Sequence, residues 1–303
     1  MPTFASLFTG GGLADVGAMA AGYELLWGVE YDPAIAAVAN ANLPHADQVY
    51  AESVVGFDWA KVARPDHLHM SPPCQDFSVA KKTGIVSNDN DALAEACLSA
   101  IRTLEPATVT LENVEGYRKA PGFQAIVDTL YGLGYWVDWQ VLNSADMGVP
   151  QTRRRLFLRA ARGMFLSPLP TPTPWVGWYQ AIKDLIPTLP ETKFAPWQLA
   201  RLPEDLEKSL LVHRNDQRSM PTREGDDPAF TILAGGNATH APSVLHRAAV
   251  SGRVVRMTPR ALARFQSVPD WYVLPEKSTL ACKVIGNGVP CLMMQRVMES
   301  FND

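Results

Sequence analysis

The stretch TFASLFTGGGLADVGAMAAG, residues 3–22, decides the fold because its periodicity changes in the middle. Its first six residues are a short apolar run, typical of a buried strand, and they lead into the glycine-rich turn TGGG. The following residues have apolar side chains at helical spacing, with Gly22 as the stop. A strand, a tight turn and a helix in this order predict the first unit of an α/β protein.

Further strand and helix patterns alternate along the first half of the chain. The next predicted strand is YELLWGVE, and Asp32 and Pro33 then have the residue types of an N-cap and a first helical turn. The remaining predicted strands are ADQVYAES, DHLHMS, ATVTLENV, YWVDWQVLN and RRLFLRA, and the predicted helices are DPAIAAVANANL and GFQAIVDTLYGLG. This alternation predicts an α/β fold with a doubly wound, mostly parallel sheet.

The second half differs in composition and in charge. FLSPLPTPTPW, residues 165–175, carries four prolines and is typical of a linker. Residues 1–150 contain 7 Lys and Arg against 18 Asp and Glu, whereas residues 151–261 contain 16 against 9. An unevenly charged, solvated surface is one interpretation, and a basic region that meets a polyanion is the other.

Cysteine usage and hydropathy indicate the class of protein. The four cysteines form no Cys-x-x-Cys pair, no run of about 18 apolar residues occurs, and MPTFASLF lacks the features of a secretory signal. We therefore expect a reduced, cytoplasmic protein without a membrane span. Cys74 is unusual among the four because it follows two prolines in the polar stretch SPPCQDFS.

Several candidate residues follow predicted parallel strands, whose carboxyl ends form the usual ligand site of such sheets. Cys74 and Glu112 combine a nucleophile with an acid, although an incidental turn cysteine and a helix cap are the simpler explanations. Glu30 follows Gly12 by 18 residues, a spacing at which an acid can accept hydrogen bonds from a ribose. Asp15 interrupts a Gly-x-Gly-x-x-Gly pattern, which favours a nucleoside-type cofactor over a dinucleotide.

The chain resembles the cytosine-C5 DNA methyltransferases, of the bacterial restriction-modification type, along nearly its whole length. The motifs that carry the resemblance occur in the order usual for that family: FTGGGLADVG, VEYDP, SPPCQDFS, ENVEGY, QTRRRLFL, RMTPRALARFQSVPD and VIGNGVPCLM. The last one departs from the family pattern Gly-Asn-Ala-Val-Pro-Pro at Gly288 and Cys291. No catalytic group of the family is missing.

The resemblance implies a fold, a reaction and a set of site residues. The fold is that of S-adenosylmethionine-dependent methyltransferases with a smaller, irregular target-recognition domain. Cys74 is expected to add to C6 of a cytosine flipped out of duplex DNA, while Glu112 bonds N3 and the exocyclic amine. Arg155 is expected to contact the flipped cytosine, and Arg153 to help hold the site. No metal is expected. The residues implied to bind S-adenosylmethionine are Phe8, Gly10, Gly12, Glu30, Glu52, Asn287 and Val289, and those implied to recognise DNA are Gln151, Thr231 and Ile232.

The resemblance also implies a domain organisation and partners. Residues 1–170 are expected to form the catalytic and cofactor-binding domain, 171–275 the target-recognition domain with its hinge, and 276–303 a segment that returns to the catalytic domain. We expect a nucleoid-associated monomer in the cytoplasm that methylates double-stranded DNA, with a restriction endonuclease that acts separately. A transfer-RNA cytosine-C5 methyltransferase is an alternative, although the Cys-Phe-Thr tripeptide usual in that branch is absent. A non-catalytic DNA-binding relative is the other alternative.

Overall fold

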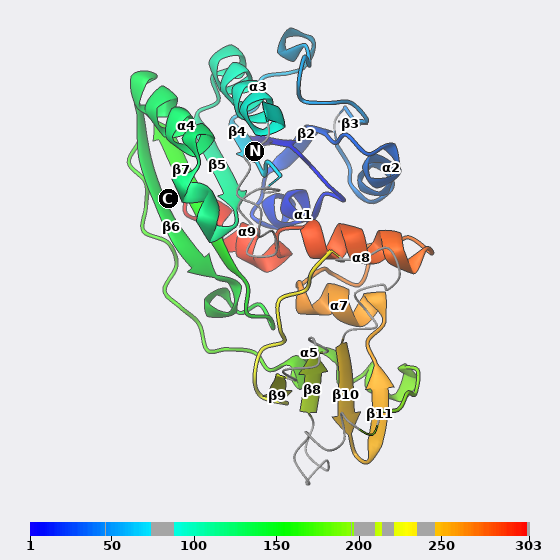
Figure 1. Ribbon diagram of the computed structural model, residues 1–303. Helices are drawn as coiled ribbons and strands as arrows, with labels where there is room; N and C mark the ends of the chain where they lie inside the picture. Colours follow the sequence, from blue (N-terminus) through cyan, green and yellow to red (C-terminus); the bar gives the residue numbers. More distant parts are fainter. Residues whose placement is uncertain are drawn as a thin grey trace. The chain divides into compact units, whose positions relative to one another are not determined.

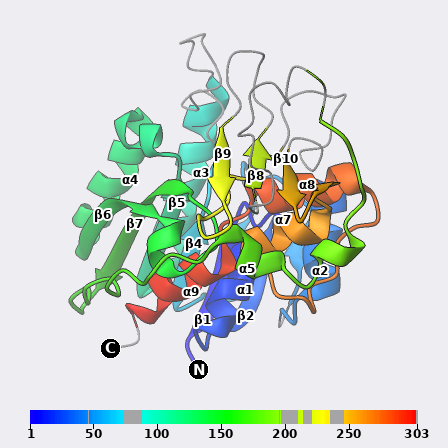
Figure 2. The same ribbon diagram turned by 90° about the horizontal axis from the view of Figure 1, so that it is seen from below.

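The computed structural model describes residues 1–45, 47–73, 88–194, 196, 210–213, 221–234 and 246–301 (Figures 1 and 2). The chain divides into two compact units. Unit 1 comprises Met1–Asn143, Arg154–Thr171 and Met294–Asp303, and unit 2 comprises Ser144–Arg153 and Pro172–Met293. Each unit is therefore discontinuous in sequence. The predicted functional domains, 1–170, 171–275 and 276–303, stay a prediction.

Unit 1 is built on a seven-stranded sheet with the order β3-β2-β1-β4-β5-β7-β6. The strands β1 to β5 pair in parallel, and β7 pairs antiparallel with both β5 and β6. This arrangement confirms the predicted α/β fold with a mostly parallel sheet. The strands are β1 (Thr3–Leu7), β2 (Glu24–Val29), β3 (Val49–Tyr50), β4 (His67–Met70), β5 (Thr108–Asn113), β6 (Tyr135–Asn143) and β7 (Arg154–Arg162).

Helices connect these strands, and three of the helices lie where the alternating pattern predicts them. They are α1 (Leu13–Ala20), α2 (Pro33–Asn42), α3 (Asn88–Leu104) and α4 (Pro121–Gly132), while α9 (Cys291–Glu299) comes from the end of the chain. The Asp32 side chain caps α2 by accepting a hydrogen bond from the Ala34 N–H at 3.0 Å, which confirms the predicted N-cap. Helix α3 was not predicted, because its first turns are acidic and polar and its apolar spacing begins only near Leu93.

The two faces of the sheet differ in chemistry. One face is aliphatic: Leu68 and Met70 of β4 and Leu111 of β5 pack in a buried cluster with residues of α3 and α4, which lie together in Figure 1. The opposite face carries buried polar side chains, namely Ser6, His67, His69, Thr108 and Thr110. Period-two alternation along β4 and β5 therefore separates an aliphatic half of the core from a hydrogen-bonded half.

Unit 2 contains a four-stranded antiparallel sheet with the order β11-β10-β8-β9, which Figure 2 shows beside short helices. The sheet was not predicted, because its strands are short and separated by polar turns. Its elements are β8 (Leu210–His213), β9 (Thr222–Glu224), β10 (His246–Val250), β11 (Arg253–Arg256), α5 (Trp178–Ile182), α7 (Pro259–Phe265) and α8 (Ser278–Asn287). Arg264 joins α7 to the loops around Asp184 and Asp270, at 2.5 and 2.7 Å. Within the described part of the chain, no helix is long and apolar enough to cross a membrane.

The buried histidines of β4 predict a dependence of stability on pH. Burial lowers the pKa of His69 from its ordinary value of 6.5 to about 4, and lowers that of His67 well below 6.5. As the pH falls from about 6.5 toward 4, the unfolded chain binds protons that the folded chain excludes. The free energy of unfolding is therefore expected to fall by about 1.4 kcal/mol per pH unit for each histidine.

The variant His69→Gln tests this expectation. Glutamine keeps a side chain that can hydrogen-bond but does not titrate. The slope of unfolding free energy against pH should therefore decrease by about 1.4 kcal/mol per pH unit, the contribution of one proton. Urea unfolding at several pH values between 4.5 and 7 measures that slope. Equal slopes for the variant and the wild-type chain would contradict a buried neutral His69.

Candidate active site

The glycine-rich turn after β1 has an unusual backbone conformation. Phe8 has a φ of 59°, Gly10 of 59° and Gly12 of 79°, and a positive φ in a bulky side chain such as Phe8 costs about 1–2 kcal/mol. A Cβ at Gly12 would stand 2.3 Å from a methyl of Leu43, so another residue would have a strained backbone and would require the Leu43 side chain to move. A Cβ at Gly10 would have no neighbour within 4 Å, which leaves the backbone of this turn open to a ligand.

Glu30, at the end of β2, is bound to the same turn. One carboxylate oxygen accepts a hydrogen bond from the Gly10 N–H at 2.9 Å, and the other accepts one from the Asp32 N–H at 2.8 Å. A carboxylate has about four acceptor sites, so these two contacts orient the group and leave acceptor capacity for hydroxyl donors. The half-buried Phe8 packs against the aliphatic core beside this turn. These hydrogen-bond donors and acceptors fit a nucleoside whose ribose hydroxyls are free to donate.

The surroundings of the other residues assigned to the cofactor do not by themselves indicate a ligand site. Glu52 is paired with Lys61 at 3.1 Å, and half of its side-chain surface is exposed. Asn287 and Val289 belong to unit 2, in which Asn287 is exposed and Val289 is buried. Their contacts with a cofactor stay predictions. No group of three or more His, Cys, Asp and Glu side chains that could hold a metal ion occurs among the described residues.

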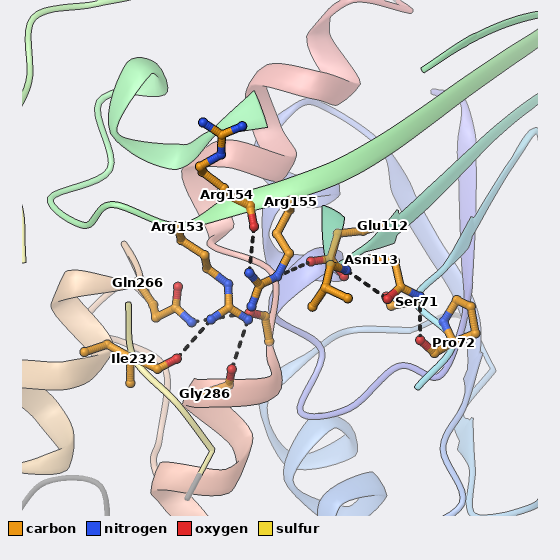
Figure 3. A network of polar contacts seen from close by, with 12 residues as sticks. Ser71, Pro72, Glu112, Asn113, Arg153, Arg154, Arg155, Ile232, Gln266 and Gly286 are labelled. Atoms are coloured by element: carbon orange, nitrogen blue, oxygen red, sulfur yellow. Dashed lines mark hydrogen bonds and ion pairs between the residues drawn. The ribbon is translucent and has the colours of Figure 1, made fainter. Parts of the chain in front are cut away.

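Glu112 lies near the end of β5 and is held by Arg155 of β7. Arg155 Nε is 3.1 Å from Glu112 Oε1, and the exposed fractions of the two side chains are 15% and 7% (Figure 3). Arg155 also donates from Nη1 to the backbone carbonyl of Arg154 at 2.7 Å. The structure thus brings together Glu112 and Arg155, two of the predicted catalytic residues. A largely buried carboxylate beside a guanidinium is suited to bind an amidine-like edge of a base.

The segment that leads to Cys74 is held by neighbouring strands. Cys74 itself lies outside the described residues, which end before it at Pro73. The Ser71 N–H donates to the Leu7 carbonyl at 3.4 Å, and Asn113 Nδ2 donates to the Pro72 carbonyl at 2.9 Å. Asn113 was not among the predicted site residues, although it directly follows Glu112 in the motif ENVEGY. Asn113 therefore links the strand of Glu112 to the residues that precede the predicted nucleophile.

Gln151, Arg153 and the segment around Ile232 form a second buried polar cluster, which lies within unit 2. Arg153 donates to the carbonyls of Ile232 and Gly286 at 2.9 and 3.0 Å, and it is 2% exposed (Figure 3). The Gln151 side chain accepts from the Ile232 N–H at 2.7 Å and donates to Gln266 Oε1 at 2.8 Å. Thr231 donates its hydroxyl to the Thr152 carbonyl at 2.6 Å.

In this cluster, the residues assigned to DNA recognition form hydrogen bonds that hold segments of unit 2 together. The side chains of Gln151 and Ile232 are fully buried, whereas Thr231 is half-buried. Direct contact of any of them with DNA stays a prediction. The expected role of Arg153 in holding the catalytic site also stays a prediction, and its hydrogen bonds hold the backbone at Ile232 and Gly286.

Comparison with known proteins adds independent information. The family model of the C-5 cytosine-specific DNA methylases matches residues 2–303. Among curated proteins, the chain is 31% identical to the Type II methyltransferase M.AplI of Arthrospira platensis, covering 97% of this chain and 84% of that one. It is 27% identical to the Type II methyltransferase M.Bsp6I of a Bacillus species, covering 99% and 98%.

Solved structures show the same fold. One is a mutant of the Spodoptera frugiperda DNMT2, with a TM-score of 0.70 and 15% identity, and the match covers 100% of both chains. Another is the methyltransferase EhMeth of Entamoeba histolytica, with a TM-score of 0.68 and 14% identity, covering 99% of this chain and 97% of that one.

The neighbouring residues Arg153 and Arg154 allow a matched test of the buried cluster in unit 2, because one is buried in it and the other is exposed. Replacing Arg153 by methionine leaves the Ile232 and Gly286 carbonyls without their donor, so we expect a loss of about 2–4 kcal/mol in unfolding free energy. Arg154 pairs only at the surface, with Glu115 at 3.3 Å, and Arg154→Met should cost less than about 1 kcal/mol. Urea unfolding of both variants measures the difference, and equal stabilities would contradict the holding role.

Proposed function

The chain belongs to the C-5 cytosine-specific DNA methylases, and from that membership we propose how its own residues carry out the reaction. The enzyme is a DNA cytosine-5-methyltransferase that uses S-adenosylmethionine. We propose that it acts through a covalent bond between Cys74 and C6 of a flipped cytosine, with Glu112 assisting at N3. The observation that carries this proposal is the buried pair between Glu112 of β5 and Arg155 of β7, because the next residue of β5, Asn113, binds the Pro72 carbonyl just before Cys74.

The chemistry explains why a thiol and an acid are needed together. C5 of cytosine is too weak a nucleophile to attack a methyl sulfonium, and S-adenosylmethionine supplies the methyl group when it is bound. Addition of the Cys74 thiolate at C6 breaks the aromaticity of the ring and turns C5 into an enamine-like carbon. The negative charge that develops at N3 is neutralised by a proton that reaches N3 through the Glu112 carboxyl group, and the resulting N3–H is proposed to donate a hydrogen bond to the Glu112 carboxylate. Loss of the C5 proton and elimination of the thiolate complete the reaction.

Arg155 orients the carboxylate for this role. With one guanidinium nitrogen on Glu112 and another on a backbone carbonyl, the carboxylate is fixed before the base arrives. A pre-oriented acid avoids the cost of reorganisation as charge develops. The stiff Pro72–Pro73 pair before Cys74 serves the same purpose for the thiol.

The cofactor is proposed to lie against the glycine-rich turn after β1. Glu30 would accept hydrogen bonds from the ribose hydroxyls, because its carboxylate is already oriented by two backbone N–H groups. The open backbone at Gly10 would admit the methionine portion, and Phe8 would pack on the adenine. The acidic character of residues 1–150 suits a ligand that carries a sulfonium and an ammonium group.

The DNA substrate is proposed to be a specific duplex sequence, read mainly by the basic second half. The curated relatives named above are Type II methyltransferases, which supports a role beside a separate restriction endonuclease. Flipping a cytosine out of the stack costs about a few kcal/mol, which phosphate contacts offset. A transfer-RNA substrate is disfavoured because the chain lacks Cys-Phe-Thr. The likeness to DNMT2 structures concerns the fold alone.

Cys74→Ser should abolish methyl transfer while leaving the affinity for S-adenosylmethionine nearly unchanged, because a hydroxyl is far less ionised than a thiol near neutral pH. The matched control is Cys97→Ser. Cys97 is fully buried, and burial raises the pKa of its thiol to about 12, so its removal should leave the chemistry intact. Transfer of a radiolabelled methyl group to DNA measures the rate, and calorimetry measures cofactor binding.

Duplex DNA with 5-fluorocytosine at the target position provides the complementary readout. Fluorine cannot leave C5 as a cation, so the enzyme should remain covalently attached after methyl transfer, and peptide mapping should place the adduct at Cys74. Near-normal turnover by Cys74→Ser, or an adduct at Cys97, Cys282 or Cys291, would remove Cys74 from the role of nucleophile.

The basic second half predicts a strong salt dependence of DNA binding. Each neutralised phosphate contributes about 0.9 to the slope of log affinity against log salt. Arg214 and Arg218, which lie outside the described residues, and Arg223, which is half-buried against Phe230, are the candidates. Replacing Arg214 or Arg218 by glutamine should lower the slope by about one unit, with unchanged cofactor affinity. A salt-insensitive affinity for duplex DNA would place the phosphate contacts elsewhere.

A further inference from the structure

Two buried histidines of β4 have no part in the reaction as proposed above. His67 and His69 alternate with Leu68 and Met70, so both imidazoles lie on the polar face of the sheet, where they are 0% and 1% exposed. The adjacent strand β5 contributes Thr108 and Thr110 to the same face. Buried imidazoles are expensive unless both nitrogens are hydrogen-bonded, so the contacts of each nitrogen decide what the pair does.

The contacts form one continuous chain that runs along the strands toward the candidate active site. His67 Nδ1 is 2.8 Å from the Thr108 hydroxyl, and His67 Nε2 is 2.9 Å from the Thr110 hydroxyl. His69 Nδ1 is 2.9 Å from the same Thr110 hydroxyl, and His69 Nε2 is 2.9 Å from the Ser71 hydroxyl. All four imidazole nitrogens therefore have a partner, and the chain ends at Ser71, three residues before Cys74.

The hydroxyl of Thr110 gives the chain a direction. It has one proton, so it donates to one imidazole and accepts from the other. At the far end, the Thr108 hydroxyl donates to the Asp66 carbonyl at 3.4 Å, and it therefore accepts from His67. His67 Nδ1 therefore carries the proton, and His67 Nε2 accepts from the Thr110 hydroxyl. His69 Nδ1 then donates to Thr110, and His69 Nε2 accepts from the Ser71 hydroxyl. The Ser71 hydroxyl is thus the donor that ends the chain.

Aromatic rings surround the pair, and the titratable groups near it are Tyr23, the carboxylates of Asp15 and Asp66, and His45 beyond Asp15. Phe4 stacks on His67 and on His69 at 5.5 and 6.2 Å, and Phe301 contacts His67 edge-on at 5.1 Å. Tyr23 packs against the edge of His67 at 5.9 Å. Asp15 of α1, bound by Ser6 and His45, and Asp66 before β4 are the nearby carboxylates. Burial keeps both imidazoles neutral, which the alternation of donors and acceptors requires.

Ser71 and Pro72 together are held by contacts from three strands. The Ser71 N–H donates to the Leu7 carbonyl of β1, its hydroxyl is tied to His69 of β4, and the next residue is held by Asn113 of β5. Pro72 and Pro73 follow and restrict the backbone further. A displacement of Ser71 would therefore pass through stiff residues to the thiol, and a misplacement of about 1 Å can cost about a hundredfold in rate.

We propose that His67, Thr110 and His69 form a buried hydrogen-bond relay that fixes Ser71, so that His69 and Ser71 are positioning residues for the Cys74 loop. This inference rests on the proposed function, in which Cys74 is the nucleophile. It assigns no chemical step to the histidines. It accounts for the presence of two imidazoles in a sheet interior that aliphatic side chains would otherwise fill.

Ser71→Ala and His69→Asn break the same link from its two ends. Alanine removes the donor, while asparagine keeps an N–H for Thr110 but no longer reaches Ser71. Each variant should lower the single-turnover rate of methyl transfer, and the rate of trapping by 5-fluorocytosine DNA, by about tenfold to a hundredfold. Affinity for S-adenosylmethionine should be unchanged. Because both changes break one link, the double variant should be no slower than the slower single variant.

Two further variants separate positioning from stability. Ser71→Thr keeps the hydroxyl and should restore most of the rate. Tyr135→Phe removes another buried hydrogen bond, from the Tyr135 hydroxyl to the Pro106 carbonyl, and should leave the rate unchanged at a comparable loss of thermal stability. If His69→Asn does not fold, Ser71→Ala against Ser71→Thr still decides the question.

Wild-type single-turnover rates for Ser71→Ala, with Cys74→Ser inactive, would overturn the relay and leave the proposed function standing. Rates that fall multiplicatively in the double variant would also overturn it, because the two side chains would then act separately. Activity in Cys74→Ser would instead overturn the proposed function.

Discussion

The register between three parallel strands is the constraint on which the rest of unit 1 depends. Leu7 of β1 pairs with Met70 of β4, and Met70 pairs with Leu111 of β5. The residues that follow them, Phe8, Ser71 and Glu112, are therefore level at the carboxyl edge of the sheet. The glycine-rich turn proposed to bind the cofactor, the residues that precede the proposed nucleophile Cys74, and the proposed acid Glu112 reach one edge through backbone pairing. A shift of one residue in β4 would turn its histidines into the aliphatic core, so packing of both faces protects this register.

Two kinds of buried polar contact meet at that edge. The Glu112–Arg155 pair is charged, and such a pair contributes little to stability because each group loses its hydration. The relay through His67 and His69 is neutral. It fixes the orientation of its side chains, because each hydroxyl and imidazole must donate to one neighbour and accept from the other. β5 carries a member of both, because Thr110 and Glu112 lie two residues apart on the same face. The same strand therefore carries both the Glu112–Arg155 contact and a contact of the histidine relay.

Much of the fold could be predicted from the sequence because it depends on local patterns. The strand–turn–helix at residues 3–22 and the Asp32 cap each follow from residue types at short spacing. The role of Glu30 at a ribose stays a prediction. Helix α3 could not be predicted because its polar first turns hide the apolar face. The relay could not be predicted either. His-x-His and Thr-x-Thr are visible in the sequence, but only the register between β4 and β5 brings them within hydrogen-bonding distance.

The three arginines of QTRRRLFL are adjacent in sequence but have different surroundings in the structure. The chain passes from unit 2 to unit 1 between Arg153 and Arg154, so the motif is divided between them. Arg153 is anchored to two carbonyls within unit 2, and Arg155 is anchored to Glu112 within unit 1. Arg154, between them, is two-thirds exposed. A guanidinium can satisfy several acceptors in a fixed plane, which a lysine cannot. The need for arginine at the first and third positions therefore has two separate physical causes, one in each unit.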